Sequence, residues 1–211
     1  MPGHTLQKYL TSWPLWAGLL VLAFLWLGPL PAMSRRAFSP HMILHLAVTS
    51  LAAPLIVAGL LRSGVAVRIS RQHTLFAVGA SIFELAVVWG WHLPELHQAA
   101  ALDDTVYVAQ QLSFLAAGIA IWWASFAGMT KVAYAIGGLA LVLTFVHMAM
   151  LGVLIGIAPE LIYEPSICLG AFGFDPLEDQ HFGGSLMAVV GGTPYLIAGI
   201  FLLNKFISEH G

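Results

Sequence analysis

The sequence predicts an all-α protein: one integral membrane domain over residues 1–211, built as a polytopic transmembrane helical bundle. Three observations support this prediction. Hydrophobic residues make up 59% of the chain, charged residues make up only 9%, and the apolar residues gather in long runs. Soluble domains contain about 25% charged residues, so this chain has too few charges to cover a surface in water. The lipid bilayer is therefore the first expected partner, and the absence of a basic patch argues against nucleic acid.

Proline and glycine divide the first half of the chain into helices. Pro29 and Pro31 end the first apolar run, and Pro40 suits the first turn of the second helix. Pro54 lies inside that second helix and should kink it. The third run ends at His92-Leu93-Pro94. Residues 95–104, which carry three acids and no base, are expected to form a loop or a surface helix.

The second half of the chain continues in the same way. Gly128-Met129-Thr130-Lys131 makes a tight connection between the fourth and fifth runs, and residues 159–179 form the longest loop. Runs of about 20 apolar residues are long enough to cross a bilayer as helices. About six spans are expected, over residues 13–30, 41–61, 74–91, 105–126, 132–157 and 180–206.

The distribution of charge predicts how these spans are oriented. One set of loops and ends carries Lys8, Arg62, Arg68, Arg71, Lys131 and Lys205. The other set carries only Arg35 and Arg36, together with every acid except Glu84 and Glu209. Because cytoplasmic loops are enriched in lysine and arginine, both termini are expected in the cytoplasm.

Two histidines open the second span and form the first candidate metal site. His41 and His45 have the i, i+4 spacing that places both on one helix face, with Cβ atoms roughly 5–6 Å apart. This face would let two imidazoles hold one metal ion. The alternative is that both are interfacial residues hydrogen-bonded to loops.

The predicted topology brings three more histidines to the same outer half of the bundle. His92 ends the third span and His181 begins the sixth. His147 lies about ten residues before the outer end of the fifth span, roughly 15 Å deep at 1.5 Å per residue. These three imidazoles, with His41 and His45, are the candidate metal ligands.

Methionines would add sulfur to the same half. Met42 is the methionine included among the candidate ligands, and Met148, Met150 and Met187 lie at similar depths. Imidazole with thioether suits copper, as Cu(I) or Cu(II), better than magnesium or calcium. The alternative is that these methionines fill the core or face lipid.

Two acids near the histidines also have more than one interpretation. Glu84 is the only acid well inside a span, where a charge is costly. It would serve either as a proton or metal partner or as a hydrogen-bonding group to a neighbouring helix. Asp179 precedes Gln180 and His181, and it would either join the metal ligands or cap a helix N-terminus.

Known catalytic patterns are missing from the sequence. No serine-histidine-aspartate order, glycine-rich phosphate loop or nucleotide motif stands out, so enzymatic activity is not expected. The single cysteine, Cys168, excludes an intrachain disulfide and a Cys-x-x-Cys metal site.

Four blocks of sequence resemble the CtaG-type cytochrome c oxidase assembly factors of bacterial membranes. The likeness runs from about Phe38 to Tyr195. The blocks are Pro40-His41-Met42-Ile43-Leu44-His45-Leu46 with Ala53-Pro54-Leu55, Trp91-His92-Leu93-Pro94-Glu95-Leu96 with Ala101-Leu102, Gln111-Leu112-Ser113-Phe114 with Gly118 and Trp122, and Pro176-Leu177-Glu178-Asp179-Gln180 with Gly183-Gly184, Met187 and Gly191-Gly192.

The resemblance implies a non-enzymatic protein of the bacterial inner membrane that handles copper while haem-copper oxidases are built. Its partners would be oxidase subunits or copper chaperones on the outer side. The family's histidines carry over to His41, His45 and His92, and its acidic block to Asp179 and Gln180.

The sequence also departs from the family pattern. Tyr107 and Gln111 stand where histidines are frequent, His181 stands where glutamine is usual, and six spans are counted where seven are often described. A copper site that has shifted within the bundle is one interpretation of these differences. Two others are a b-type haem protein that uses His45 and His147 to carry electrons, and a structural subunit with vestigial histidines.

Overall fold

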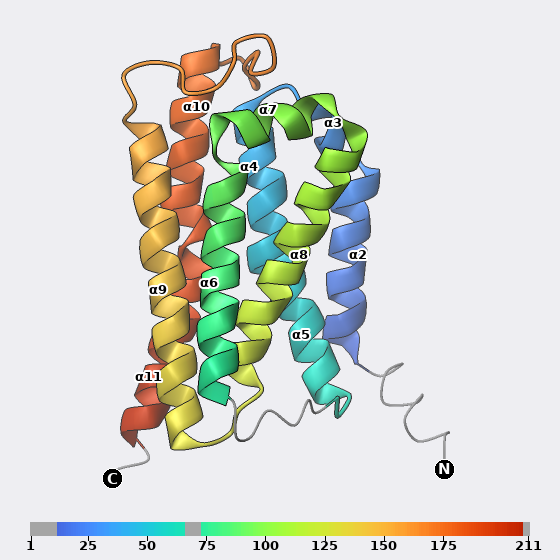
Figure 1. Ribbon diagram of the computed structural model, residues 1–211. Helices are drawn as coiled ribbons and strands as arrows, with labels where there is room; N and C mark the ends of the chain where they lie inside the picture. The colour runs from blue at the N-terminus through green and yellow to red at the C-terminus, as the bar shows by residue number, and fades with distance from the viewer. Residues whose placement is uncertain (1–11, 66–72, 209–211) are drawn as a thin grey trace.

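The computed structural model describes residues 12–65 and 73–208, and within these ranges every regular element is helical. The helices pack side by side as one bundle (Figure 1). Their bounds are α2 Trp13–Leu27, α3 Leu30–Ser34, α4 Phe38–Ala47, the π-helix η1 Val48–Ala52, α5 Ala53–Arg62, α6 His73–Trp91, α7 Pro94–Leu102, α8 Asp104–Phe126, α9 Lys131–Gly156, α10 Pro176–Ser185, the π-helix η2 Leu186–Gly191, and α11 Thr193–Ser208.

The membrane-spanning helical bundle predicted from composition is confirmed. Five helical stretches of the described chain are long and apolar enough to cross a bilayer: Phe38–Arg62, Thr74–Trp91, Asp104–Phe126, Lys131–Gly156 and Pro176–Ser208. The first expected span is a shorter apolar helix, Trp13–Leu27, because Pro29 and Pro31 follow and the chain restarts as α3. The last span begins at Pro176, four residues before its expected start, because Asp175 caps a new helix there.

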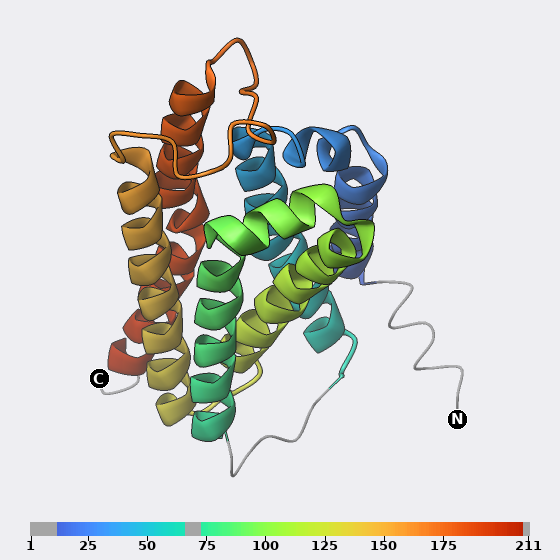
Figure 2. The ribbon, with the colours of Figure 1, turned by 45° about the horizontal axis from the view of Figure 1, so that its top comes forward.

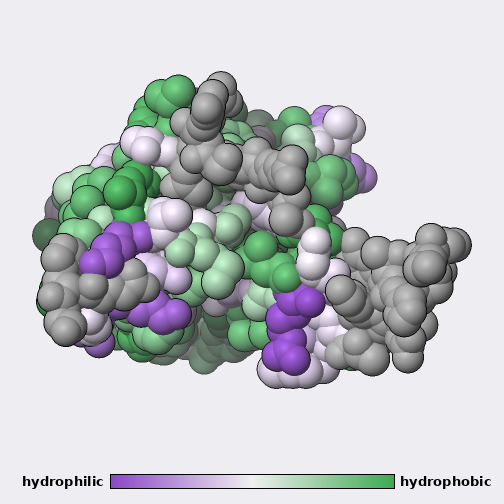
Figure 3. All heavy atoms as spheres, turned by 90° about the horizontal axis from the view of Figure 1, so that it is seen from below, coloured by the Kyte–Doolittle hydropathy of each residue, from purple (hydrophilic) through white to green (hydrophobic). Residues whose placement is uncertain are grey.

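The bundle has two different ends. α2 begins and α11 ends at one of them, here called the terminal face (Figure 1). The opposite end, the loop face, carries α3, α7 and the segment 157–175, which arches over the helix ends (Figures 1 and 2). Polar residues gather in patches on the terminal face (Figure 3), as expected for an end that meets water. Lys8, Arg68 and Arg71, on which the predicted orientation partly depends, lie outside the described residues.

Pro54 perturbs its helix through a π-turn. The carbonyl of Thr49 would pair with the residue five positions on, which is Pro54 and has no N–H to give. Trp122 Nε1 and Tyr195 Oη donate to this oxygen instead, at 2.9 and 3.2 Å. The expected distortion at Pro54 is therefore a π-helical turn, Val48–Ala52, whose free carbonyl ties α8 and α11 to the second span.

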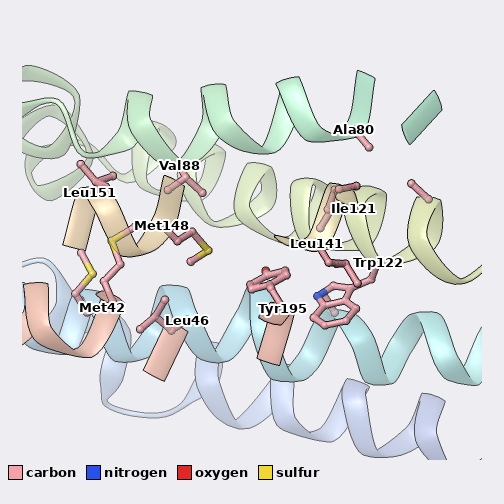
Figure 4. Packing of buried hydrophobic residues seen from close by; sticks show 14 of the residues in the cluster. Met42, Leu46, Ala80, Val88, Ile121, Trp122, Leu141, Met148, Leu151 and Tyr195 are labelled. Carbon is pink, nitrogen blue, oxygen red and sulfur yellow. The ribbon is translucent and has the colours of Figure 1, made fainter. Parts of the chain in front are cut away.

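The core lies between α4, α6, α8, α9 and α10–α11. Met42 and Leu46 of α4 lie in one layer with Val88 of α6 and with Met148 and Leu151 of α9 (Figure 4). α9 and α10 meet backbone to backbone, since a Cβ on Gly184 would lie 2.5 Å from the Gly156 amide nitrogen. α10 also packs against the start of α4, where a Cβ on Gly183 would lie 2.5 Å from Phe38 Cδ1.

Candidate metal site

The histidine pair at the start of the second span is buried. His41 and His45 are 2% and 0% exposed, and they lie one turn apart on α4, as the i, i+4 spacing predicts. Their ring centres are 6.3 Å apart. The expected hydrogen bonds to loops are not made by His41 Nε2 or by either nitrogen of His45, which have no partner. The interfacial interpretation is therefore wrong for this pair.

Two further imidazoles complete a four-histidine cluster of His41, His45, His92 and His97. His92 lies just beyond the end of α6, with its ring centre 5.7 Å from that of His41 and 5.5 Å from that of His45. His97 lies on α7, with its ring centre 4.8 Å from that of His41. His41 thus contacts all three other rings.

His97 was not predicted from the sequence, because the leucines of α7 face outward and its small and polar side chains face the protein. Pro94 occupies the first turn of α7, and Leu93 and Leu96 point outward, 52% and 41% exposed. His97 and Ala100, one turn apart, face inward and are 4% and 2% exposed. Leucines at a membrane surface face lipid, so the small and polar residues are the ones that face the protein. The i, i+3 pair after Pro94 was the signal available in the sequence.

Most ring nitrogens of the cluster have no hydrogen-bond partner, and one donates to a backbone carbonyl. His92 Nδ1 lies 2.5 Å from the carbonyl oxygen of Val88, and because a carbonyl can only accept, Nδ1 carries the proton. Metal-binding histidines usually donate one ring N–H in this way and bind the ion with the other nitrogen. His92 Nε2, His41 Nε2, both nitrogens of His45 and His97 Nδ1 have no hydrogen-bond partner, although buried polar atoms are nearly always paired.

The spacing of the rings is close to that of ligands to one tetrahedral ion but does not match it. A nitrogen ligand lies about 2.0–2.1 Å from a tetrahedral metal ion, which places two such ring centres roughly 5–5.5 Å apart. The separations of 4.8, 5.5 and 5.7 Å lie close to this value, and the His41–His45 separation of 6.3 Å is longer. Within residues 12–65 and 73–208, no group of three His, Cys, Asp or Glu side chains is placed so that it could hold a metal ion. Binding therefore requires the rings to turn toward a common centre.

Aromatic residues and one thiol enclose the cluster. Phe38, Phe114 and Tyr163 contact its rings, with centre-to-centre distances of 4.1 to 6.3 Å. Tyr163 also donates a hydrogen bond to the His92 carbonyl at 3.1 Å. Cys168 Sγ lies 4.0 Å from His97 Nε2. Burial raises the pKa of this thiol to about 12, so Cys168 is protonated at neutral pH.

A small closed hollow lies between the cluster and an open pocket at the loop face. An open pocket of about 910 Å³ lies there, with Arg35, Arg36 and Ala101 in its wall. A small hollow beside it shares Arg35 and Ala101 and is lined by His41 and His97. Arg35 lies at the boundary between the two hollows, where it donates to the Ala101 carbonyl at 3.0 Å and to Asp104 at 2.5 Å. Arg35 thus lines both the open pocket and the closed hollow beside His41 and His97.

The lowered pKa values of two histidines in the cluster predict that the protein loses stability at acid pH. Burial lowers the pKa of His92 to about 4 and, with the charge of His92, that of His97 to about 3. Both values lie below the unfolded value of 6.5, so stability is complete above about pH 6.5 and is lost as the pH falls toward 4. His92 alone should cost about 2 kcal/mol by pH 5, measured as a lower unfolding temperature of the detergent-purified protein at pH 5 than at pH 7.5.

The control for this prediction is the variant His92→Gln/His97→Gln, which removes both titrations. It should lose clearly less stability than the wild type over the same interval, in which exposed carboxylates remain ionised. Equal losses in the two proteins would contradict the prediction.

The other predicted ligands lie in different surroundings. His147 Nε2 is 2.6 Å from Glu84 Oε2 in the core. His181, partly exposed, donates from Nε2 to the Ala158 carbonyl at 2.8 Å. Met42 is part of the apolar core. Asp179 holds the N-terminus of α4, where it accepts hydrogen bonds from the backbone N–H groups of Phe38 and Ser39 at 2.7 and 3.2 Å and from the Ser39 hydroxyl.

Asp179 therefore caps a helix, as one of its two interpretations predicted, but it caps α4 rather than its own helix. α10 is capped by Asp175, whose carboxylate accepts from the amides of Leu177 and Glu178. Gln180, beside Asp179, accepts a hydrogen bond from the Ile162 amide at 2.8 Å and donates one to the Glu160 carbonyl at 3.2 Å, both in the loop. This acidic block thus joins α10 both to the helix that carries His41 and to the loop above it.

The fold and the site together define a multi-pass helical membrane protein with histidines buried between its helices near one face. The chain belongs to the family of cytochrome c oxidase caa3 assembly factors, whose family model matches residues 8–209. The resemblance seen in four sequence blocks is confirmed and extends over nearly the whole chain. No curated protein and no solved structure matches it.

The structure also locates the residues at which the sequence departs from the family pattern. Tyr107 lines the hollow beside His41 and His97, and its hydroxyl is 3.0 Å from the Ser34 hydroxyl. Gln111 accepts a hydrogen bond from Trp26 Nε1 at 3.3 Å. Tyr107 thus connects α8 to α3, and Gln111 connects α8 to α2. A histidine at position 107 would stand near the cluster, in a place where this chain has a phenol.

Proposed function

We propose that this protein holds copper at His41, His45, His92 and His97 and supplies it during the assembly of cytochrome c oxidase. The observation that supports this proposal is the four-histidine cluster itself. Three rings from α4 and the end of α6 contact one another, the His97 ring of α7 contacts His41, and several of their ring nitrogens have no protein partner. Family membership supports the assembly role, and the cluster supports the choice of a metal.

The chemistry of the cluster favours copper, and Cu(I) in particular. Imidazole is a good ligand for copper, and hard cations such as magnesium and calcium require oxygen. None of the four side chains carries a negative charge, so no ligand in the site neutralises the charge of the bound ion. The cost of burying charge rises steeply with its size, which favours a monovalent ion over a divalent one. Cys168 beside His97 is a soft group as well, but its thiol would have to lose its proton to bind Cu(I).

The exchange of copper would take place at the loop face. The pocket beside Arg35 opens there, and the distribution of lysine and arginine supports an orientation with this face outside the cytoplasm. The partners would then be copper chaperones or oxidase subunits on the outer side of a bacterial inner membrane. The protein's role would be to bind and transfer the ion without catalysing a reaction.

The metal and haem content of the purified protein tests this proposal. The detergent-solubilised chain is loaded with Cu(I) under reducing conditions, desalted, and analysed for copper by elemental analysis and for haem by its absorption spectrum. About one copper per chain without a Soret band is expected. Haem without copper would support an electron carrier that uses His45 and His147, and neither group would support a structural subunit.

A further inference from the structure

A buried acid–imidazole pair lies apart from the histidine cluster. Glu84 of α6 is 0% exposed, and its Oε2 lies 2.6 Å from Nε2 of His147 on α9. The two residues are 63 positions apart in the chain, so the fold brings them together. Ionisable groups inside a membrane are costly and usually serve a function. The proposed copper site makes no use of this pair.

The surroundings of the pair contain few polar groups. Thr144 Oγ1, one turn before His147, is 3.5 Å from the same carboxylate oxygen. Tyr195 of α11 is the other titratable group that faces Glu84, but its hydroxyl donates to the Thr49 carbonyl. Glu84 Oε1 and His147 Nδ1 have no hydrogen-bond partner. The pair is thus a nearly isolated site for one exchangeable proton.

The geometry lets that proton leave without breaking the pair. With the proton bound, a carboxylate faces an imidazolium, and the pair has no net charge. Loss of the Nδ1 proton leaves the Nε2–H bond to Oε2 in place, and the pair becomes a carboxylate with a neutral imidazole, of net charge −1. The unpartnered Nδ1 loses no hydrogen bond in this step.

The pair is close enough to the histidine cluster to respond to an ion there. Glu84 precedes His92 by eight positions, about 12 Å along the axis of α6 at 1.5 Å per residue. Val88 lies between them, one turn after Glu84, and its carbonyl accepts from His92 Nδ1. A cation among four neutral imidazoles lacks a counter-charge, and the carboxylate two turns below is the group that can supply one.

We propose that the Glu84–His147 pair is a proton site coupled to the histidine cluster, so that a monovalent cation bound there favours loss of a proton from the pair. The inference rests on the proposed copper function. A positive charge enters the cluster and H⁺ leaves the pair for the solvent, which offsets part of the added charge, and no electron moves. Binding would then be favoured at higher pH and release at lower pH.

Proton release during Ag⁺ binding tests the coupling. Ag⁺ is a soft monovalent ion that needs no reductant, and the full chain in detergent is titrated with it in weak buffer with a pH dye at several pH values from about 6 to about 8.5. His92 and His97, with pKa values of about 4 and about 3, have no proton to lose in this range. A tenfold coupling releases at most about half a proton per bound ion, so the wild type should release up to about 0.5 proton per Ag⁺ at the pH of maximal release, and Glu84→Gln and His147→Asn close to none.

The affinity for Ag⁺ gives a second measure. A unit charge at about 12 Å through an effective dielectric of about 20 changes affinity by at most about tenfold, so Glu84→Gln should bind Ag⁺ up to about tenfold more weakly, with the largest difference at the alkaline end of the pH series. Thr144→Val, which leaves both titratable groups in place, is the matched control and should release protons as the wild type does.

Two results would overturn the proposal: Ag⁺ binding to the wild type without proton release, or undiminished release by both Glu84→Gln and His147→Asn. Failure of the wild type to bind Ag⁺ would be a different result, because it would overturn the proposed copper function and, with it, the coupling.

Discussion

Replacing His41 and His45 together by alanine is expected to lower the affinity for copper by at least 100-fold. Changing a residue that merely orients a metal ligand already costs 10–100-fold, and this variant removes two of four ligands. His41 is the ring that contacts all three others, so its loss leaves no shared centre. The measurement is competition for Cu(I) with a chelator of known affinity, under anaerobic conditions.

The variant should still fold, which makes its loss of copper informative. His41 Nε2 and both nitrogens of His45 make no hydrogen bond, so their removal strands no partner. His181→Ala is the matched control, since His181 bonds only the Ala158 carbonyl near the loop, and it should keep wild-type affinity. His97→Ala should weaken binding, and wild-type affinity in that variant would show that the cluster is not the site.

Replacing Asp179 by alanine is expected to lower the free energy of unfolding by about 3–5 kcal/mol. Its carboxylate accepts hydrogen bonds from two backbone amides and one hydroxyl at the start of α4. Each bond to a charged group contributes about 1.5–3 kcal/mol, and the stranded donors add their own desolvation cost. The measurement is equilibrium unfolding of the purified protein in mixed detergent micelles.

Asp175→Ala provides the comparison, because Asp175 is the same residue type four positions earlier and also caps a helix. Its capping bonds to α10 are exposed, so its loss should cost only about 1 kcal/mol. Asp179→Ala should also weaken Cu(I) binding, since it frees the start of the helix that carries His41. Equal costs for the two variants would contradict a buried structural role for Asp179.

Composition and periodicity were sufficient for the architecture. Low charge and long apolar runs predict a membrane-spanning bundle for a physical reason: in lipid, each segment must satisfy its own backbone polar groups, and helices do this. Proline positions likewise predicted where the first run ends and where the second helix is perturbed. The i, i+4 spacing of His41 and His45 placed both on one face, because the period of a helix is a local property.

Only the tertiary structure decided which residues share a site. The predicted depth of His147 was compatible with the cluster, but the rotation of α9 turns it toward Glu84, and hydrophobicity does not determine rotation when a helix is apolar all round. His97 escaped notice because its helix lies at the membrane surface, where leucines point outward. Asp179 caps α4 because α10 packs closely against Phe38 at the start of α4. Such contacts join residues far apart in the chain, and no local pattern in the sequence records them.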